Sequence, residues 1–200
     1  MKTAKKATRP RGRPSRKSEI VAATEALLRE KGLAGVTTRA IAESVPCSEG
    51  AIYVHFEDRL ALILAVLEES LPEMLVPLHE LKEKVGVDSV EGNLTIALRG
   101  LHQFHQRVMV MMCSLISDPE LRERFRQSLA EHGRGPKRGV ETLARYIEEE
   151  KALGRVADRV DAKQAALALM SGSFFSVFTA ELLGEEESVD ASGLVGMVLG

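Results

Sequence analysis

The sequence has little of what several protein classes require. It contains no tryptophan, and aromatic residues make up only 4% of its 200 residues, so a core must rest on aliphatic side chains and methionine. Its two cysteines, Cys47 and Cys113, are too few for a disulfide framework and fit a reducing compartment. No apolar run reaches the roughly 18 residues of a membrane-spanning helix, and the basic N-terminus lacks the apolar core of a signal peptide. We therefore expect a cytoplasmic protein with no membrane partner.

What is present is the composition of a globular helical protein. Hydrophobic residues account for 44% of the chain and charged residues for 28%, which is ordinary for a folded protein. Leucine and alanine favour helices, and the alternation of polar and apolar residues that indicates strands is rare. The sequence predicts an all-α fold.

The charge of the chain is unevenly distributed. The net charge is −2, yet residues 1–17 hold eight lysines and arginines and no acid, which leaves 19 basic and 29 acidic residues elsewhere. A basic disordered arm on an acidic body suggests a polyanionic partner, although a solubilising tail explains such a segment equally well. The run Arg11-Gly12-Arg13-Pro14 favours the first interpretation, because extended Arg-rich segments suit a narrow minor groove. Arg11 and Arg13 are therefore candidate DNA contacts.

Apolar residues recur at helical spacing along most of the chain. Thr37 and Ser48 are candidate N-caps of two short helices, and Pro46 ends the first of them. These two helices lie three residues apart after a longer one, which is the helix-turn-helix layout. The longer predicted helices cover residues 18–31, 58–84, 94–117, 120–131, 137–153, 161–183 and 192–199.

Residues 36–60 read VTTRAIAESVPCSEGAIYVHFEDRL. This segment resembles the signature of the TetR/AcrR family of bacterial transcriptional regulators. The resemblance is specific across residues 18–67, whereas beyond them it is only architectural. It implies a three-helix DNA-binding domain at residues 18–57 and a helical effector-binding and dimerisation domain at residues 58–200. The matching elements are Thr37-Thr38-Arg39, Ile41-Ala42, Gly50, Ile52-Tyr53, His55-Phe56 and Arg59 before Leu60.

Candidate DNA contacts lie in and just after the two short helices. Ser48 leaves N–H groups free to meet a phosphate. Gly50 suits a close approach of backbone and DNA, the alternative being a simple bend of the helix. His55 either donates to a phosphate or packs under the next helix. Arg39 has the geometry to bind a guanine bidentately, the alternative being a solvated surface residue. By resemblance, the positions that contact DNA in the family are Thr38, Arg39, Glu49, Ala51, Tyr53 and Arg59.

The apolar residues of the same segment have a packing role. Ile41, Val45, Ile52 and Phe56 can fill a small core behind the short helices, and Ala42 lets these helices approach closely. The opposite face of the second short helix is then free to enter a major groove.

Two positions depart from the family pattern. The turn between the short helices is usually Ala-Gly-Val, but here it is Val45-Pro46-Cys47. Proline cannot adopt the left-handed backbone that glycine permits, so we expect a different turn conformation. Glu49 stands where the family often has lysine. A carboxylate repels phosphates and is tolerated best if it accepts from a cytosine amino group; exposure at the helix start, which the helix dipole favours, is the alternative.

The C-terminal half is expected to bind an effector and to form the dimer. By resemblance, its last two helices pack against their copies in a second subunit as a four-helix bundle. The 161–183 helix is apolar all round, which predicts burial on more than one face. In the 58–84 helix, Pro72 and Pro77 are expected to kink or break the chain.

The 94–117 helix is the best candidate wall for an effector cavity. Its stripe is apolar apart from His105, which bonds either an effector's polar head or a partner in the core. The stripe offers few groups to neutralise charge, so a predominantly apolar effector is expected. The candidate effector residues are Leu98, Leu101, His102, His105, Val108, Met109, Met112, Phe174, Phe175 and Phe178.

A metal site is a further alternative on the same helix. His102, His105, Met109 and Cys113 share a narrow stripe, and nitrogen with soft sulfur suits copper or zinc. Four residues stacked along one helix cannot all converge on one ion, so at most His102, His105 and Met109 would bind it, with help from elsewhere.

The sequence contains no nucleophile elbow, phosphate-binding glycine loop or paired metal-ligand motif. We therefore predict neither an enzyme nor a cofactor. We predict a homodimeric repressor that binds a palindromic double-stranded operator and is released by a small apolar effector. The alternative is an architectural, weakly specific DNA-binding protein driven by its basic arm.

Overall fold

The computed structural model describes residues 15–131, 135, 137–184 and 190–200. Every regular element in these ranges is an α-helix, and no strand occurs in them, so the predicted all-α fold is confirmed. Most of the basic arm, with Arg11 and Arg13, lies outside the described residues, as do parts of the loops predicted at 132–136 and 185–187.

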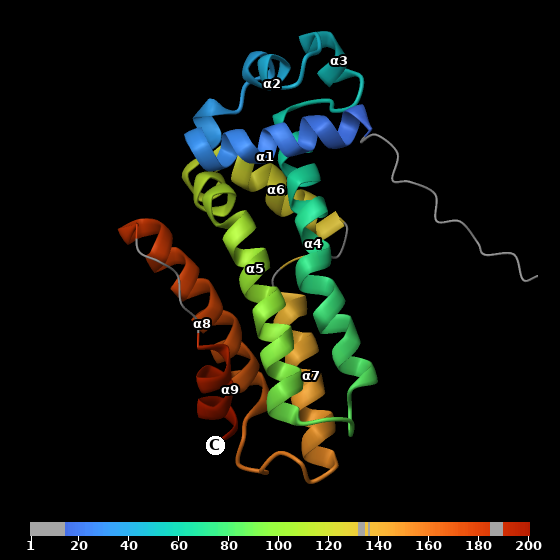
Figure 1. Cartoon of the computed structure of the whole chain (residues 1–200), viewed down its shortest axis with the longest axis vertical. Helices are drawn as coiled ribbons and strands as arrows, with labels where there is room; N and C mark the ends of the chain where they lie inside the picture. The colour runs from blue at the N-terminus through green and yellow to red at the C-terminus, as the bar shows by residue number, and fades with distance from the viewer. Residues whose placement is uncertain (1–14, 132–134, 136, 185–189) are drawn as a thin grey trace, which may run out of the picture.

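The described helices follow the predicted order along the chain (Figure 1). The first three form a head at one end of the molecule, and the longest ones run from the head through the body. Their bounds are α1 Arg16–Gly35, α2 Thr38–Ser44, α3 Glu49–Tyr53, α4 Arg59–Glu83, α5 Val90–Ser117, α6 Pro119–Glu131, α7 Lys137–Ala152, α8 Ala162–Leu183 and α9 Ala191–Leu199.

Side-chain caps fix the starts of the short helices. Thr37 Oγ1 accepts a hydrogen bond from the backbone N–H of Ala40 at 3.1 Å. Ser48 Oγ accepts from the backbone N–H of Ala51 at 3.3 Å. Both predicted caps are confirmed, and each stabilises a helix by about 1 kcal/mol.

Gly32, which directly follows the helix predicted at residues 18–31, and the prolines of the predicted 58–84 helix affect the backbone differently. Gly32 interrupts the helical backbone of α1 with φ 63° and ψ −170°, and the last turn continues to Gly35. Pro72 and Pro77, by contrast, lie inside one continuous helix α4, so of the predicted kink or break the break does not occur. Packing explains the continuity, because residues on both sides of the prolines, such as Ile63 and Leu78, are buried in the two cores described next.

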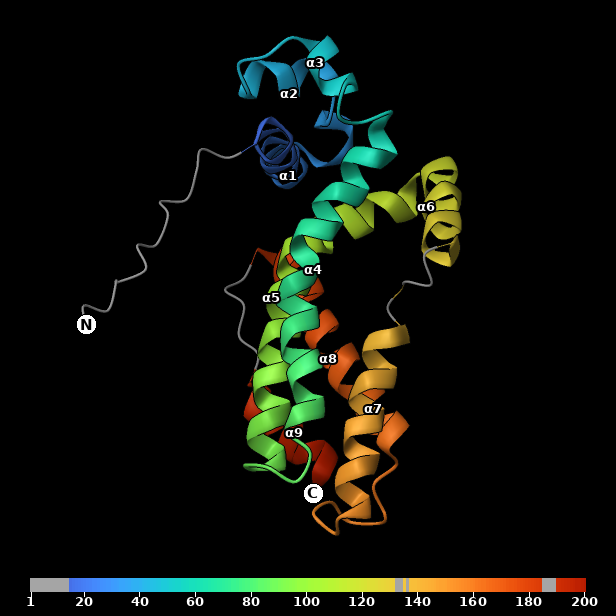
Figure 2. The ribbon, with the colours of Figure 1, turned by 90° about the vertical axis from the view of Figure 1, so that its right-hand side faces the viewer.

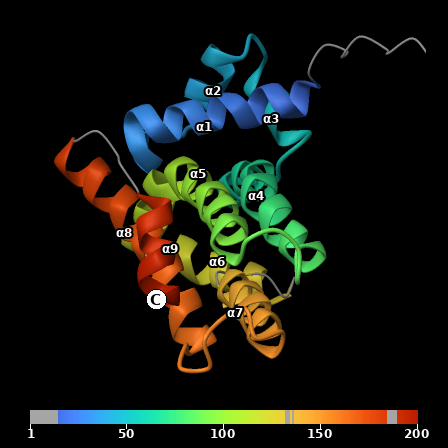
Figure 3. The same cartoon turned by 60° about the horizontal axis from the view of Figure 1, so that its bottom comes forward.

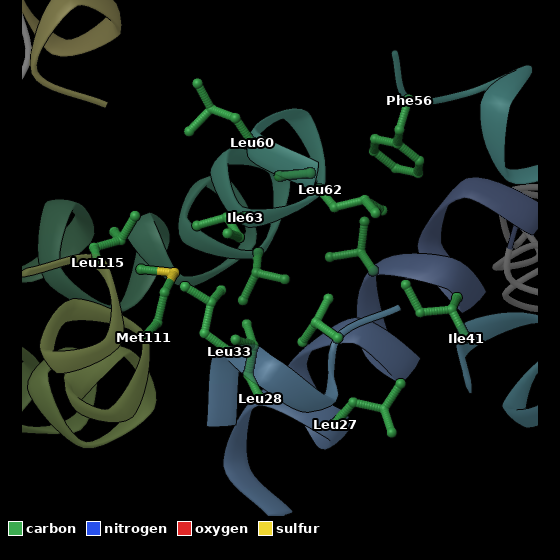
Figure 4. Close-up of a cluster of buried hydrophobic side chains, with 14 of the residues drawn as sticks. Leu27, Leu28, Leu33, Ile41, Phe56, Leu60, Leu62, Ile63, Met111 and Leu115 are labelled. Atoms are coloured by element: carbon green, nitrogen blue, oxygen red, sulfur yellow. The ribbon is translucent and has the colours of Figure 1, made fainter. Parts of the chain in front are cut away.

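One buried cluster, the head core, joins α1, α2 and α3 to the start of α4, the end of α5 and α6. Figure 4 shows Leu28 and Leu33 of α1 beside Ile63 of α4, with Met111 and Leu115 of α5 on the other side. The predicted boundary at residue 57 therefore does not separate two independent cores. The head rests on the ends of the two long helices.

A second cluster, the body core, lies at the far ends of the same two helices. It gathers the end of α4 and the start of α5 with α7, α8 and α9 (Figures 2 and 3). Leu94, Leu98 and Leu101 of α5 are almost fully buried there, as are Tyr146 and Ile147 of α7. Both α4 and α5 contribute to both cores, so either helix can carry a displacement from body to head.

By length and composition, one described helix, α8, could cross a membrane, although only 22% of its most apolar window is buried. This finding qualifies the expectation of no membrane span. It also identifies α8 as a helix that carries apolar residues on its exposed side.

Candidate DNA interface and effector region

The two short helices lie over α1, at the end of the molecule farthest from the body core (Figures 1 and 2). Their apolar side chains point back toward α1. Ile41 and Ile52 are 0% and 1% exposed, and Val45 and Phe56 are buried as well. The predicted packing role of these residues is confirmed, and the polar side of α3 is left to solvent.

The candidate DNA contacts of the two short helices and the segment after α3 are exposed or half-buried. Tyr53 is 58% exposed. His55 is also exposed, and its ring meets that of Phe56 edge-on, with ring centroids 6.4 Å apart. This exposure disfavours packing under α4, and donation from His55 to a phosphate stays a prediction. The accessible candidates are Thr38, Arg39, Ser48, Glu49, Gly50, Ala51, Tyr53 and His55.

The turn between α2 and α3 is formed without a left-handed residue. Val45 has φ −113° and ψ 108°, and its N–H donates to the carbonyl oxygen of Ile41 at 2.9 Å. Among the described non-glycine residues, Asp88 alone has a positive φ. Pro46 is thus accommodated by a turn in which no residue has a positive φ, and Val45 and Ser48 on either side of it are extended.

Two hydrogen bonds organise the polar side chains of α2 and α3. Thr38 Oγ1 donates to Glu49 Oε2 across 2.5 Å. Arg39 Nε donates to Glu43 Oε1 across 3.0 Å, and this bond, followed by the charges of Glu43 and Glu49, raises the pKa of Arg39. The Arg39 side chain is 81% exposed, and such an exposed pair contributes little to stability. Its guanidinium is therefore available to a stronger partner.

Gly50 is not required by its surroundings in the protein. A Cβ atom at this position would meet only Ser48 Oγ, at 3.8 Å, and Gly50 is not among the described glycines with a positive φ. Glycine in a helix costs about 0.5–1 kcal/mol relative to alanine. A close approach of DNA to the backbone of α3 would account for that cost.

Arg59 contacts the protein itself. Its Nη2 donates to the carbonyl oxygen of Leu33 at the end of α1. The neighbouring Asp58 accepts from Arg124 of α6; burial opposes ionisation of Asp58, but this bond and a backbone N–H outweigh it and lower its pKa. Arg59 and Arg124 also line a pocket of about 140 Å³ against the start of α6. The contact of Arg59 with DNA that the resemblance implies stays a prediction.

The described head carries no excess of positive charge. Residues 15–66 include six lysines and arginines against seven acidic residues. Residues 1–14, by contrast, hold six basic residues and no acid. Because attraction to phosphates depends on cations, the net positive charge that a nucleic-acid partner would require lies in residues 1–14 and not in the described head.

His105 lies between the two cores, on α5. It is 7% exposed, and its Nδ1 lies 2.9 Å from Ser173 Oγ of α8. Burial, followed by the charge of His102, lowers the pKa of His105 to about 4, so the ring is neutral at neutral pH. The ring thus has a partner within the chain, and an effector head that bonded Nδ1 would replace Ser173.

The other predicted effector residues fall into two groups. Those on α5 are buried or half-buried, whereas those on α8 are exposed. Phe174 is 40% exposed and meets His105 edge to face, with ring centroids 5.5 Å apart, while Phe175 is 65% exposed and Phe178 37%. Contact of these residues with an effector stays a prediction. The α5 group is Leu98, Leu101, His102, Val108, Met109 and Met112.

Two surface pockets lie away from the predicted effector residues. The larger, of about 350 Å³, is lined by residues at the start of α8 and the end of α9, including Arg159, Gln164 and Val198; the smaller is the one beside Arg59. In the described ranges, no three His, Cys, Asp or Glu side chains are grouped so that they could hold a metal ion. The metal alternative gains no support from this geometry.

Several contacts between distant segments had no signal in the sequence. Arg107 of α5 donates from Nε and Nη2 to the two carboxylate oxygens of Glu25 on α1, at 3.0 and 2.7 Å. The fully buried Glu150 accepts from the N–H of Gly86 at 3.1 Å and pairs with Arg155 at 3.2 Å. The first of these contacts joins residues 82 positions apart and the second residues 64 apart. Helical periodicity reports only neighbours three or four residues away and could not reveal either contact.

Residues 20–66 match the family described as bacterial regulatory proteins, tetR family. This range contains α2 and α3 with their turn and most of α1. No curated protein matches the chain.

The fold as a whole recurs in solved structures. A TetR transcription regulator from Haloarcula marismortui has a TM-score of 0.69 and 22% identity, over 92% of this chain and 95% of its own. GusR of Salmonella enterica has a TM-score of 0.65 and 18% identity, over 91% and 92%. FadR of Bacillus subtilis, solved in complex with stearoyl-CoA, has a TM-score of 0.64 and 17% identity, over 91% and 95%. These similarities establish the fold of the chain, and the match at residues 20–66 identifies its head as a helix-turn-helix domain of the tetR family of bacterial regulatory proteins.

Proposed function

We propose that this regulator is a homodimer that binds a near-palindromic operator and leaves it when a small, predominantly apolar effector binds. The observation that carries the proposal is the coexistence of two uncovered faces in one chain. The exposed side of α3 carries the polar groups of Glu49 and Tyr53 next to the single aliphatic side chain of Val54, whereas the exposed side of α8 is apolar. The first suits a nucleic acid and the second suits a protein.

The apolar face of α8 has a second copy of the chain as its occupant. Its inner side is buried against the body core, while its outer side stands at the edge of the molecule (Figure 1). Monomeric proteins rarely expose a large contiguous apolar patch, and a two-fold dimer would bury the same patch on both copies. The exposed large residues, here called the α8 face, are Leu167, Phe174, Phe175, Phe178, Leu182 and Leu183.

Such a dimer gives the head its operator geometry. Two copies of α3, related by two-fold symmetry, would enter successive major grooves on one side of the duplex. The same interface accounts for the apolar, mostly unburied window of α8 without a membrane. Homodimerisation and a cytoplasmic location therefore belong together in this proposal.

The effector is proposed to enter where α5 meets α8. His105 and Ser173 form a polar pair there among apolar neighbours. One polar head could replace one partner of this pair, but several charges would lose their hydration without compensation. The FadR neighbour, which binds stearoyl-CoA, supports a ligand with a long apolar portion.

The structure offers a route from this region to the head. Arg107 lies two residues after His105 on α5, and both of its bonds to Glu25 reach α1. A displacement of α5 by the effector would therefore move α1 and, through the head core, α3. Release requires that the effector favour a conformation in which the two heads no longer match the half-sites.

Straight-chain fatty acids are the first probes of this proposal. An acid that binds should raise the melting temperature of the free protein and weaken operator binding by roughly 5- to 150-fold. Met112→Trp and His105→Leu should alter this response without changing operator affinity in its absence, whereas Ile96→Trp, at an exposed position of the same helix, should not. An unchanged response in both variants would contradict the placement of the site, and release by a multiply charged hydrophilic compound would contradict the apolar class.

A further inference from the structure

An acidic side chain lies at the N-terminus of α3, the helix proposed to enter the major groove. Glu49 is the first residue of α3, it is exposed, and its Oε2 is already bound by Thr38 Oγ1 at 2.5 Å. A carboxylate in this place repels phosphates and weakens binding to DNA of any sequence. Glu49 therefore does not add general affinity for DNA; base recognition is the role in which its charge would serve the interface, beside the stabilisation that the helix dipole gives an acid in the first turn of α3.

The chemistry of the major groove restricts what Glu49 can read. A carboxylate only accepts hydrogen bonds, and only cytosine N4 and adenine N6 present donors in this groove. Adenine carries the acceptor N7 next to its amino group, so a carboxylate there meets a second lone pair. Guanine and thymine offer acceptors alone. Thr38 holds the carboxylate through Oε2, so Oε1 can accept from one amino group, and cytosine suits it best.

We infer that Glu49 determines operator specificity by accepting a hydrogen bond from a cytosine amino group in each half-site, and that Thr38 is its positioning residue. The inference rests on the proposed function of the head as an operator reader. Arg39 lies close enough for the Glu49 charge to act on it, and guanine is the preferred base of an arginine. Together the two residues favour a half-site that contains both bases.

Thr38 is well suited to hold the carboxylate. A free glutamate side chain samples many rotamers, whereas a β-branched threonine has few. Thr38 is the first residue of α2, directly after the Thr37 cap, so its backbone is fixed by the helix start. The hydrogen bond from Thr38 thus restricts the rotamers of Glu49 and positions its Oε1 for a base.

Selection of duplexes from a randomised pool by the full-length chain tests this inference. The wild-type protein should enrich cytosine at one position of the half-site by about tenfold. Glu49→Gln should change the preferred base at that position to adenine, because a glutamine amide pairs with adenine N6 and N7. Glu30→Gln, which removes the same charge from an exposed site on α1, should leave the profile unchanged.

Variants at Thr38 test the positioning role separately. Thr38→Val keeps the shape but removes the donor, so the preference for cytosine at that position should fall severalfold while the melting temperature changes little. Thr38→Ser keeps the hydroxyl and should restore the preference. A purely structural role of Thr38 would lower the melting temperature and leave the base profile intact, which would overturn this part of the inference.

Two outcomes distinguish a failure of the proposed role of Glu49 from a failure of the proposed operator function. If Glu49→Gln binds every sequence more tightly and selects the wild-type motif, Glu49 acts only through its charge and the inference is wrong, while the operator function stands. If the wild-type protein itself selects no motif, both the proposed operator function and the role of Glu49 are wrong.

Discussion

The exposed sides of α3 and α8 are both uncovered in the isolated chain, but they differ in chemistry. The side of α3 carries polar groups that water hydrates, so its exposure is not strongly unfavourable in the absence of a partner. The α8 face exposes six large apolar side chains, and their hydration is unfavourable at all times. In the proposed function, the DNA partner is therefore transient and the second copy of the chain is permanent. Permanent pairing would also make the two α3 helices a fixed two-headed reader.

The largest effect is expected from a charge placed on the α8 face, because it tests whether this face is a dimer interface. Phe175→Asp would remove a phenylalanine from each side, worth about 1.5–3 kcal/mol apiece, and would bury two charges. We expect monomers in sedimentation velocity and a loss of operator binding. Leu153→Asp, at another exposed apolar position, is the control. A variant at Phe175 that sediments as the wild type does would refute the assignment.

The second test asks whether α3 alone supplies the affinity of the head for DNA. Deletion of residues 2–14 leaves Ser15 in place to cap α1 and removes six positive charges. Each lost phosphate contact should reduce the slope of log K against log salt concentration by about 0.9. If the arm reads the minor groove, the loss should be greater on sites flanked by A·T pairs. An unchanged slope would show that the arm is a solubilising tail.

The third test concerns base reading by α2. Arg39→Ala should remove about 1–3 kcal/mol of discrimination between the operator and random DNA, because a bidentate guanine contact is lost. Glu43→Ala, which frees the guanidinium from its exposed ion pair, should cost none of this discrimination. Equal losses of Arg39→Ala on both duplexes, measured at one salt concentration, would mean that Arg39 binds only phosphate.

The fourth test addresses the body through His105. Its pKa of about 4 in the folded chain lies below that of free imidazole, so the unfolded chain takes up the proton first as the pH falls. The contribution of His105 to the free energy of unfolding is therefore fully present above about pH 6.5 and declines toward pH 4. The expected loss between pH 7.5 and pH 5 is about 2 kcal/mol. Urea unfolding at the two pH values measures this loss. His105→Leu should abolish it and His79→Leu, at an exposed site, should not.

The smallest expected effect concerns Gly50. Gly50→Ala should raise the free energy of unfolding by about 0.5–1 kcal/mol, because nothing in the protein crowds the added methyl group. The same change should weaken operator binding if DNA approaches the backbone of α3 closely. A variant that gains stability and keeps its full operator affinity would show that Gly50 is only a bend.

The helix-turn-helix was predictable because its determinants are local. Thr37 and Ser48 cap the helices that follow them within three residues. Ile41 and Val45, and likewise Ile52 and Phe56, are buried pairs spaced four residues apart, as on one side of a helix. Their side chains therefore identify both the helices and the buried side. The exposed side, with Glu49 and Tyr53, follows by elimination.

The body was less predictable because its determinants lie far apart in the sequence. The α5 stripe was correct as a buried face, but the partner of His105 is Ser173, 68 residues away. The clamp between Arg107 and Glu25 likewise joins segments that no short-range pattern connects. Pro72 and Pro77 favoured a break locally, yet packing on both sides of them preserved α4. Tertiary contacts outweighed the local signal there.

The most direct test of the account is the sequence of the DNA that the full-length chain selects from a random duplex pool at physiological salt. A permanent dimer with two α3 helices predicts an inverted repeat whose half-site centres lie about one helical turn, or a multiple of it, apart. Recovered sequences that are no more enriched than the starting pool would contradict the account and would favour an architectural protein held on DNA by its basic arm.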